Sequence, residues 1–133
     1  MLTAHDRTTI SDLIALHGHL VDAGHLDRLH TLFTPDIAYD VTDLGGAVLE
    51  GLDALRQAAL ALGAGNPVAH HVTNIVLTEV SGTDVRALSK GLGVNTDGTC
   101  GSVTYEDTVV MTDSGWRISR RKVQARRVPL NNA

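Results

Sequence analysis

The chain has 133 residues, of which 43% are hydrophobic and 20% charged, and its formal net charge at pH 7 is -4. This length suits a single domain over 1–133, and the composition is that of a folded globular protein rather than a disordered or fibrous one. The negative charge and an aromatic content of 3% exclude the basic surface and the base-stacking platforms of nucleic-acid-binding proteins. We therefore expect no nucleic-acid partner.

The cysteine content and the hydropathy pattern indicate a cellular compartment. A single cysteine, Cys100, excludes an intramolecular disulfide framework and a zinc site built from several cysteines. No apolar run approaches the roughly 18 residues that span a bilayer. His, Asp and Arg side chains interrupt residues 1–14, where a signal peptide would be apolar. We expect a cytoplasmic protein without a membrane partner.

Helical periodicity dominates the first part of the chain. Apolar side chains recur every three or four residues over 8–24, which predicts a first helix. A short second helix is expected over 26–33, before Thr34-Pro35-Asp36 breaks it. Alternation over 37–41 predicts a strand, and a third helix is expected over 52–62, because a glycine-rich segment follows it.

The second part of the chain predicts strands. After Pro67, β-branched residues predominate, and three turn signals separate four segments. The predicted strands are 70–80, 84–94, 99–112 and 116–127. Helices first and a meander of long strands afterwards is an α+β order. We expect three N-terminal helices on one face of a strongly curved, mostly antiparallel sheet, closing a conical pocket.

The other face of this sheet bears on assembly. Simple alternation places apolar residues on it, such as Ile75, Leu77, Val110 and Ile118. A small domain has few helices left to cover such a face. We therefore expect a homodimer or a homotrimer.

Histidine is frequent, with seven residues in the chain. The adjacent pair His70 and His71 opens the first long strand, where neighbours point to opposite faces, so only one of them can face the enclosed side. The pattern leaves open which one, and a hydrogen-bonded histidine at a strand end is the alternative to a functional one. His17 and His19 point away from each other on a helix, and no His-x-x-x-His spacing on one helix occurs, so we expect no metal site.

A pocket histidine works as a base only when a carboxylate fixes its tautomer and stabilises its charged form. Asp22 is the candidate that stands out, because a negative charge in the last turn of a helix opposes the helix dipole at a cost of up to about 1 kcal/mol. It lies off the apolar stripe of that helix, so a pocket role requires the helix to be covered on two sides. A solvent-exposed aspartate is the alternative.

Three segments resemble a known family. They are HGHLVDAGHLDRLHTLFTPD at 17–36, AHHVTN at 69–74 and GWRISRR at 115–121. Together they resemble the SnoaL-like branch of the nuclear-transport-factor-2-like superfamily, over nearly the whole chain. This branch includes scytalone dehydratase, bile-acid dehydratase and hexachlorocyclohexane dehydrochlorinase, which are lyases that need no cofactor. The resemblance implies the conical α+β fold and chemistry without a bound cofactor or metal.

The resemblance also implies roles for particular residues. Asp22 falls where these lyases keep the aspartate of a His-Asp dyad, and His70 falls where they keep the base, which selects it over His71. Arg121 matches an arginine that the dehydrochlorinase places in its pocket. Tyr39 lies near a strand position where scytalone dehydratase has a tyrosine.

The chain departs from the family pattern at two places. Where relatives have a tyrosine five residues before the aspartate, this chain has His17, which we expect to face the pocket. A second acid that some dehydratases supply from the next strand is missing, because the nearby Asn95 can donate a hydrogen bond but cannot transfer a proton. His17, Tyr39 or Asn95 would then bind the developing oxyanion or the leaving hydroxyl.

These residues predict a cofactor-free, dehydratase-like lyase acting on a small, largely apolar carbonyl-containing or cyclic molecule. His70 would be the general base, Asp22 would orient its ring, and Arg121 would add positive charge at the end of the pocket. A double-bond isomerase or cyclase with the same pocket is the alternative. A non-catalytic small-molecule-binding or assembly protein of the same fold is another, because fold does not determine function.

Overall fold

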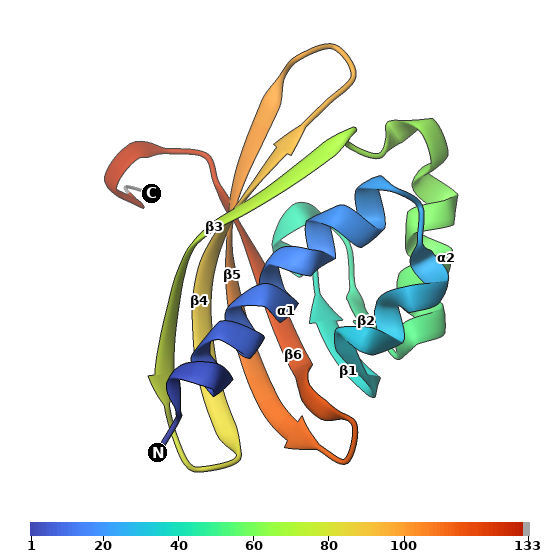
Figure 1. Cartoon of the computed structure of the whole chain (residues 1–133). Helices are drawn as coiled ribbons and strands as arrows, with labels where there is room; N and C mark the ends of the chain where they lie inside the picture. The colour runs from blue at the N-terminus through green and yellow to red at the C-terminus, as the bar shows by residue number, and fades with distance from the viewer. Residues whose placement is uncertain (132–133) are drawn as a thin grey trace.

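A curved six-stranded sheet forms the body of the structure, a computed structural model that describes residues 1–131 (Figure 1). Its strands are β1 (Phe33–Asp40), β2 (Val48–Glu50), β3 (Ala69–Glu79), β4 (Asp84–Val94), β5 (Cys100–Thr112) and β6 (Gly115–Arg126). Their order is β2-β1-β6-β5-β4-β3, and every neighbouring pair is antiparallel except β1 and β6. The predicted α+β fold with a mostly antiparallel sheet is confirmed.

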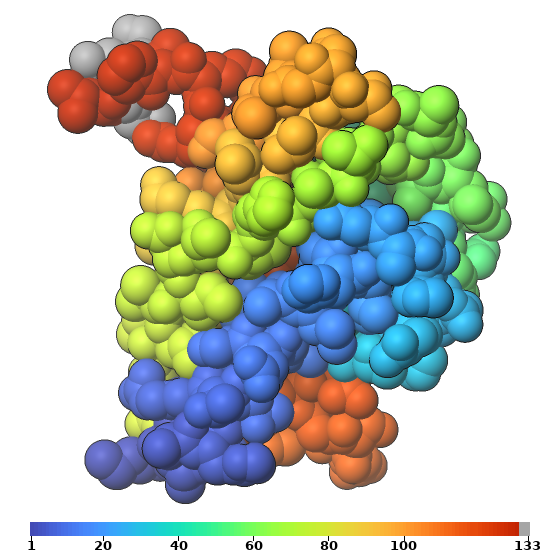
Figure 2. Space-filling model, turned by 45° about the horizontal axis from the view of Figure 1, so that its top comes forward, coloured from blue at the N-terminus to red at the C-terminus, as the bar shows by residue number. Residues whose placement is uncertain are grey.

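The two α-helices, α1 (Ala4–Asp22) and α2 (Leu52–Leu62), lie on one side of this sheet. The short 3-10 helices are η1 (Leu26–Thr31), η2 (Thr42–Leu44), η3 (Gly63–Gly65) and η4 (Pro129–Asn131), and η4 extends away from α1 and α2. α1 crosses the sheet in contact with β3 and β6, whereas α2 packs on β1 and β2. Figure 2 shows α1, in blue, side by side with β3, in yellow-green. Among residues 1–131, no helix is long and apolar enough to cross a membrane.

The first helix begins at Ala4 rather than at residue 8, because the preceding residue caps it. The Thr3 hydroxyl accepts a hydrogen bond from the Asp6 backbone N–H, and the Asp6 carboxylate accepts one from the Thr3 N–H, both at 3.0 Å. This reciprocal capping box satisfies two N–H groups that the helix itself leaves unpaired. The backbone hydrogen bond from Thr3 lowers the pKa of Asp6.

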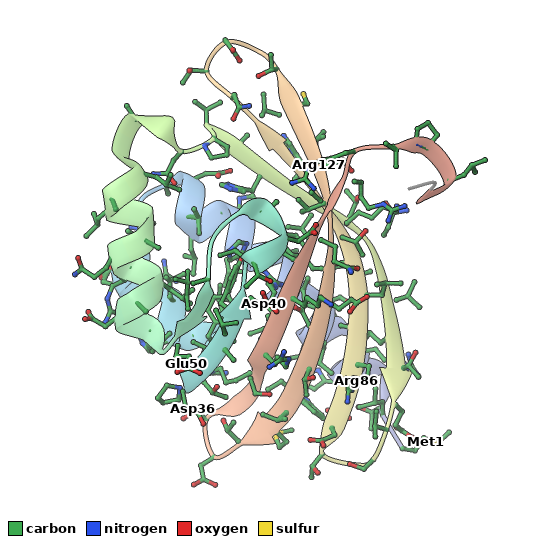
Figure 3. The ribbon with its side chains drawn as sticks, turned by 180° about the vertical axis from the view of Figure 1, so that it is seen from behind. Met1, Asp36, Asp40, Glu50, Arg86 and Arg127 are labelled. Atoms are coloured by element: carbon green, nitrogen blue, oxygen red, sulfur yellow. The ribbon has the colours of Figure 1, made fainter. Side chains whose placement is uncertain are left out.

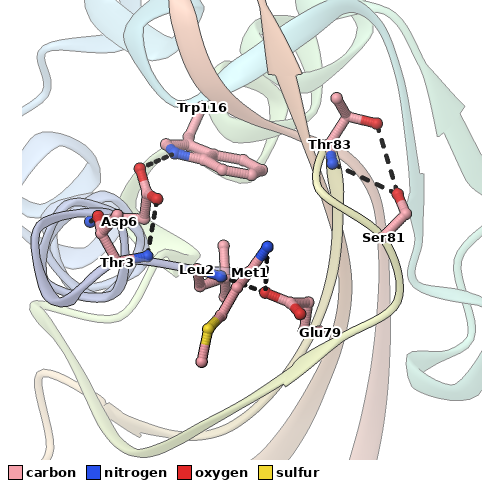
Figure 4. A network of polar contacts seen from close by, with 8 residues as sticks. All are labelled: Met1, Leu2, Thr3, Asp6, Glu79, Ser81, Thr83 and Trp116. Carbon is pink, nitrogen blue, oxygen red and sulfur yellow. Dashed lines mark hydrogen bonds and ion pairs between the residues drawn. The ribbon is translucent and has the colours of Figure 1, made fainter.

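Polar contacts fasten the start of α1 to the far end of the sheet (Figure 4). The Trp116 indole of β6 donates to Asp6 over 3.3 Å, and the Glu79 carboxylate of β3 accepts from the Leu2 backbone N–H. These contacts join the helix start to strands distant in sequence. These contacts fix the first end of α1 on the sheet, and a contact of Asp22 with β3, described below, fixes its last end.

The segment after α1 differs from its prediction. The second helix is a 3-10 helix that ends at Thr31, and β1 begins at Phe33 and continues through Pro35. Proline is tolerated there because the pairing of β1 with β6 is interrupted between Phe33 and Ala38. β2, which is only three residues long, was not predicted and pairs with the end of β1.

A β-bulge in β3 reverses the alternation expected for that strand. Thr73 pairs with Lys90 and Val76 with Leu88, so three steps on β3 face two on β4, and Asn74 has a positive φ of 56°. Beyond this bulge, the side chains that would face outward in a regular strand face inward instead.

The prediction for the outer face was therefore wrong for three of its four residues. Ile75 and Leu77 pack against the core, and Ile118 is fully buried in it. Val110 is half-buried next to the buried Val109, as alternation predicts. The apolar residues exposed on β3 and β4 are instead Val76, Leu88 and Leu92. Assembly into a homodimer or homotrimer stays a prediction.

Candidate active site

Asp22, the last residue of α1, lies against His70 near the start of β3. The Asp22 Oδ1 atom is 2.7 Å from His70 Nδ1, and Asp22 Oδ2 accepts a hydrogen bond from the His70 backbone N–H over 2.9 Å. The two side chains are only 27% and 18% exposed. The contact predicted between these residues is present. Because the carboxylate binds Nδ1, it favours the tautomer with the proton on Nδ1 and leaves Nε2 unprotonated.

A glycine lets α1 and β3 approach this closely. A Cβ atom at Gly18 would lie 2.4 Å from the His70 carbonyl oxygen, a distance that real Cβ atoms essentially never show. Gly18 is four residues before Asp22, so both lie on the same side of α1. Glycine costs about 1 kcal/mol relative to alanine inside a helix. Gly18 therefore weakens the helix slightly, but it permits the close contact between α1 and β3 that brings Asp22 to His70.

We expect Gly18→Ala to lower the free energy of unfolding by about 1 to 3 kcal/mol, the usual range for overpacking, although alanine is the better helix former. Urea denaturation measures the change. The control is Gly65→Ala, because a Cβ at Gly65 meets nothing within 4 Å. A Gly18→Ala protein as stable as the wild type would show that α1 moves away from β3 without cost.

His70 lines a cavity with two adjoining lobes between the helices and the sheet. The inner lobe has a volume of about 440 Å³, and its walls are mostly apolar side chains of α1, η1, β1 and α2. The outer lobe, of about 710 Å³, extends toward the turn between β4 and β5. His17, Tyr39 and His70 line both lobes, so they stand where the lobes meet.

The η2 turn lies beside this cavity and is tied to the end of β6. Asp43 Oδ2 accepts a hydrogen bond from the Ala125 backbone N–H over 2.7 Å, and the Asp43 carbonyl oxygen accepts one from Arg127 over 3.0 Å. Figure 3 shows Arg127 where the chain leaves β6. Leu44 of η2 lines both lobes, so this attachment holds one wall of the cavity in place.

His17 faces the cavity as predicted and is almost fully buried. Its ring centroid lies 6.1 Å from that of His70 and 5.9 Å from that of Phe33. Burial lowers the pKa of His17 well below its ordinary value, and the charge of Arg121 adds to the shift. At neutral pH, His17 is therefore an uncharged group that can take part in hydrogen bonds without adding positive charge.

Two tyrosines border the cavity, and only one was predicted. Tyr39 of β1 lines both lobes, as expected. Tyr105 of β5 was missed; it lines the outer lobe, and its ring lies 6.3 Å from that of His17. Burial raises the pKa of both phenols, so both keep their protons at neutral pH. Alternation along β5 divides its side chains into two sets, one on each face of the sheet, and Tyr105 belongs to one of them. The local sequence does not tell which set faces the helices, so it did not identify Tyr105.

Arg121 does not line either lobe, which corrects its predicted place at the end of the pocket. It is 0% exposed and forms two hydrogen bonds with Asp107, from Nε over 2.7 Å and from Nη2 over 2.9 Å. Its guanidinium lies 4.3 Å from the ring centroid of Tyr105. Burial by itself lowers the pKa of Arg121, but Asp107 outweighs it and raises the pKa. Its charge acts on the cavity from beneath the tyrosines.

Asn95 lies at the rim of the outer lobe. Its amide nitrogen donates to the Thr99 hydroxyl over 3.0 Å, and its backbone N–H donates to the Thr99 carbonyl over 2.9 Å. These bonds close the turn between β4 and β5. The Asn95 side chain is therefore tied to its own hairpin, and a role in binding the substrate stays a prediction.

The charged groups of the site are paired and its other polar groups are neutral. Asp22 pairs with His70, Asp107 pairs with Arg121, and His17 is kept uncharged by burial. Within residues 1–131, no three His, Cys, Asp or Glu side chains are grouped to hold a metal ion. The arrangement suits removal of a proton by His70 next to a group whose developing negative charge accepts hydrogen bonds.

Known proteins share this architecture. Residues 2–122 match the model of the SnoaL-like domain family. An NTF2-like protein with a cystatin-like fold from Novosphingobium aromaticivorans is 30% identical, with 97% of this chain and 84% of that chain covered and a TM-score of 0.77. LinA is 24% identical, with 96% and 90% covered and a TM-score of 0.77. A protein from Novosphingobium aromaticivorans DSM 12444 provisionally named scytalone dehydratase is 22% identical, with 98% and 99% covered and a TM-score of 0.75. Comparison with curated protein sequences gives no significant match.

Proposed function

Since this chain belongs to the SnoaL-like domain family, we propose that it is a dehydratase-like lyase acting on a small, largely apolar, carbonyl-containing or cyclic molecule. The observation that carries the proposal is the Asp22–His70 pair, held at 2.7 Å where the two lobes of the cavity meet. The provisional name of the scytalone dehydratase-like protein supports the same class of reaction. Because side chains supply each group that the reaction needs, we propose that it uses no bound cofactor.

In the proposed reaction, His70 Nε2 removes a proton from the carbon next to the substrate carbonyl. The electron pair of the broken C–H bond forms a carbon–carbon double bond, and the carbonyl π pair moves onto oxygen. Asp22 stabilises the imidazolium that forms. When the carbonyl reforms, the electron pair of the enolate double bond forms a new double bond between the α-carbon and the next carbon. The bond from that next carbon to its hydroxyl breaks, and the hydroxyl leaves as water with the proton that His70 returns. Acid–base assistance of this kind contributes about 10² to 10⁴ in rate.

The walls of the inner lobe support an apolar substrate. Val21, Leu26, Leu29, Leu49 and Leu55 line it, and no Asp, Glu, Lys or Arg side chain of residues 1–131 does. A charged group placed there would lose its hydration without gaining a counter-ion. An uncharged ring or chain is therefore the ligand that this lobe favours.

Double-bond isomerisation is the second candidate. It needs one group that takes a proton from one carbon and returns it to another, and His70 can do both. Burial keeps His17 neutral and both tyrosines protonated, so none of these is a ready proton donor to a leaving hydroxyl. That observation favours a reaction in which His70 alone moves the proton.

Deuterium exchange tests the proposal. The protein is incubated in D₂O with a panel of cyclic and open-chain β-hydroxy ketones and β,γ-unsaturated ketones, and NMR follows exchange at the α-carbon, loss of water and movement of the double bond. We expect exchange by the wild type and at least about a 100-fold loss in His70→Gln. His71→Gln is the matched control, because His71 is exposed. Binding of panel members with no exchange would contradict catalysis and indicate a binding protein.

A further inference from the structure

We infer that Tyr105 is a further catalytic residue, whose hydroxyl donates a hydrogen bond to the substrate oxygen that becomes negatively charged when His70 removes the proton. This inference rests on the proposed function and supplies a donor that the sequence did not identify. Three features of the structure support it: the path of the ring, the open hydroxyl and the charge beneath it.

The Tyr105 ring leans across the neighbouring strand β4 toward β3. A Cβ atom at Gly91 would lie 2.5 Å from Tyr105 Cε2 and 2.7 Å from its hydroxyl oxygen, so only glycine leaves room for this ring. Gly91 pairs with Val72 of β3. His70 is two residues from Val72 and therefore on the same face of β3. The phenol thus extends toward the strand that carries the base.

The Tyr105 hydroxyl is open to the cavity. The residue is only 4% exposed, yet it lines the outer lobe together with His17 and His70. Its oxygen is not among the sealed, unpartnered side-chain atoms found within residues 1–131, and no hydrogen bond of this hydroxyl occurs in that part of the chain. No side chain or backbone group of these residues therefore competes for the proton of this hydroxyl. It is free to donate to an oxygen of a substrate bound in the cavity.

The charge beneath the ring makes Tyr105 a strong donor. The Arg121 guanidinium lies 4.3 Å from the ring centroid and is held there by two hydrogen bonds to Asp107. A cation over the face of a phenol draws electron density from the ring and its oxygen. Burial raises the pKa of Tyr105, which keeps the proton in place at neutral pH. A donor that is already fixed in place stabilises developing negative charge without reorganisation.

Tyr39 provides the comparison. It also borders both lobes of the cavity, but the Arg121 guanidinium lies farther from its ring centroid, at 5.8 Å. Removal of the Tyr39 hydroxyl makes the same chemical change as removal of the Tyr105 hydroxyl. Tyr39→Phe therefore tests whether the other phenol of the cavity, rather than Tyr105, is the donor.

A pair of probes tests the donor without knowledge of the substrate. 4-Nitrophenolate carries an oxyanion on an apolar ring, and nitrobenzene is the same ring without that oxygen. Calorimetry at a pH where the phenol is ionised gives both affinities. We expect the wild type to prefer 4-nitrophenolate, and Tyr105→Phe to weaken its binding roughly 10- to 100-fold, the range for a hydrogen bond to a charged group. Nitrobenzene binding should change less than about threefold, since no hydrogen bond to the probe is removed.

Three results would overturn the inference: no preference for 4-nitrophenolate in the wild type, an unchanged preference in Tyr105→Phe, or the loss in Tyr39→Phe instead. Gly91→Ala is the second variant, because its Cβ displaces the Tyr105 ring and should reduce the preference in the same direction. His70→Gln separates this inference from the proposed function. This variant should lose deuterium exchange, which tests the proposed function, and keep the preference for 4-nitrophenolate, which tests the role of Tyr105. Failure of one claim can therefore be told from failure of the other.

Discussion

Asp107→Asn should lower the free energy of unfolding by about 3 to 5 kcal/mol, the range for a buried ion pair that loses one partner. The variant leaves the Arg121 guanidinium without its counter-charge, in a place where it is 0% exposed. Its Nη1 atom already has no hydrogen-bond partner among residues 1–131. The free energy of unfolding of a domain is only about 5 to 15 kcal/mol, so the loss of this one carboxylate removes a large part of it. The midpoint of guanidinium denaturation measures the effect.

Two further variants give this prediction its controls. Replacement of the whole pair, Asp107→Leu with Arg121→Met, should restore most of the stability, because apolar residues of similar size need no counter-ion. Arg56→Gln removes a partly exposed pair in which Arg56 Nη2 lies 3.8 Å from Asp53, and should cost less than about 1 kcal/mol. Equal losses in Asp107→Asn and Arg56→Gln would show that water reaches the Arg121 guanidinium.

Asp22→Asn and His70→Ala should each lower the turnover number by about 10² to 10⁴. His70→Ala removes the base. Asp22→Asn can turn its amide N–H toward His70 Nδ1, which places the ring proton on Nε2 and occupies the lone pair that the reaction uses. Single-turnover rates on a compound found by deuterium exchange measure both losses, and circular dichroism checks the fold.

The double variant shows whether the two residues act as one unit. Groups that act together are not additive, so Asp22→Asn with His70→Ala should lose little more than the worse single variant. Asp53→Asn is the control carboxylate, because Asp53 lies in the first turn of α2 and is 83% exposed. A double loss equal to the product of the single losses would mean that Asp22 acts independently of His70.

Much of the secondary structure follows from local signals, and the sequence predicted it well. The helix at 52–62 and the strand at 84–94 have the predicted bounds. Apolar periodicity and turn residues act within a few positions, so they are readable without the fold. The start of α1 was misplaced by four residues, from 8 to 4, because its capping box at Thr3 and Asp6 was not recognised.

The candidate site was predicted in part. The residue types and the family resemblance indicated Asp22, His70, His17 and Tyr39, which the structure brings to one cavity or to its edge. Gly18 was missed, because its role depends on a backbone atom 52 positions away, at His70. No sequence pattern within α1 indicates that this helix approaches β3 so closely.

The sequence by itself determined the order of helices and strands and the residue types available for chemistry. The tertiary structure alone decided which side chains of β3 and β6 face inward beyond their bulges. A bulge near Asn74 turns Ile75 and Leu77 inward, and a second register shift, between Ile118 and Arg120, turns Arg121 inward, where it meets Asp107. One inserted residue inverts the alternation beyond it, and whether the insertion exists depends on the register with the neighbouring strand. That register is a property of the assembled sheet, not of the strand's own sequence.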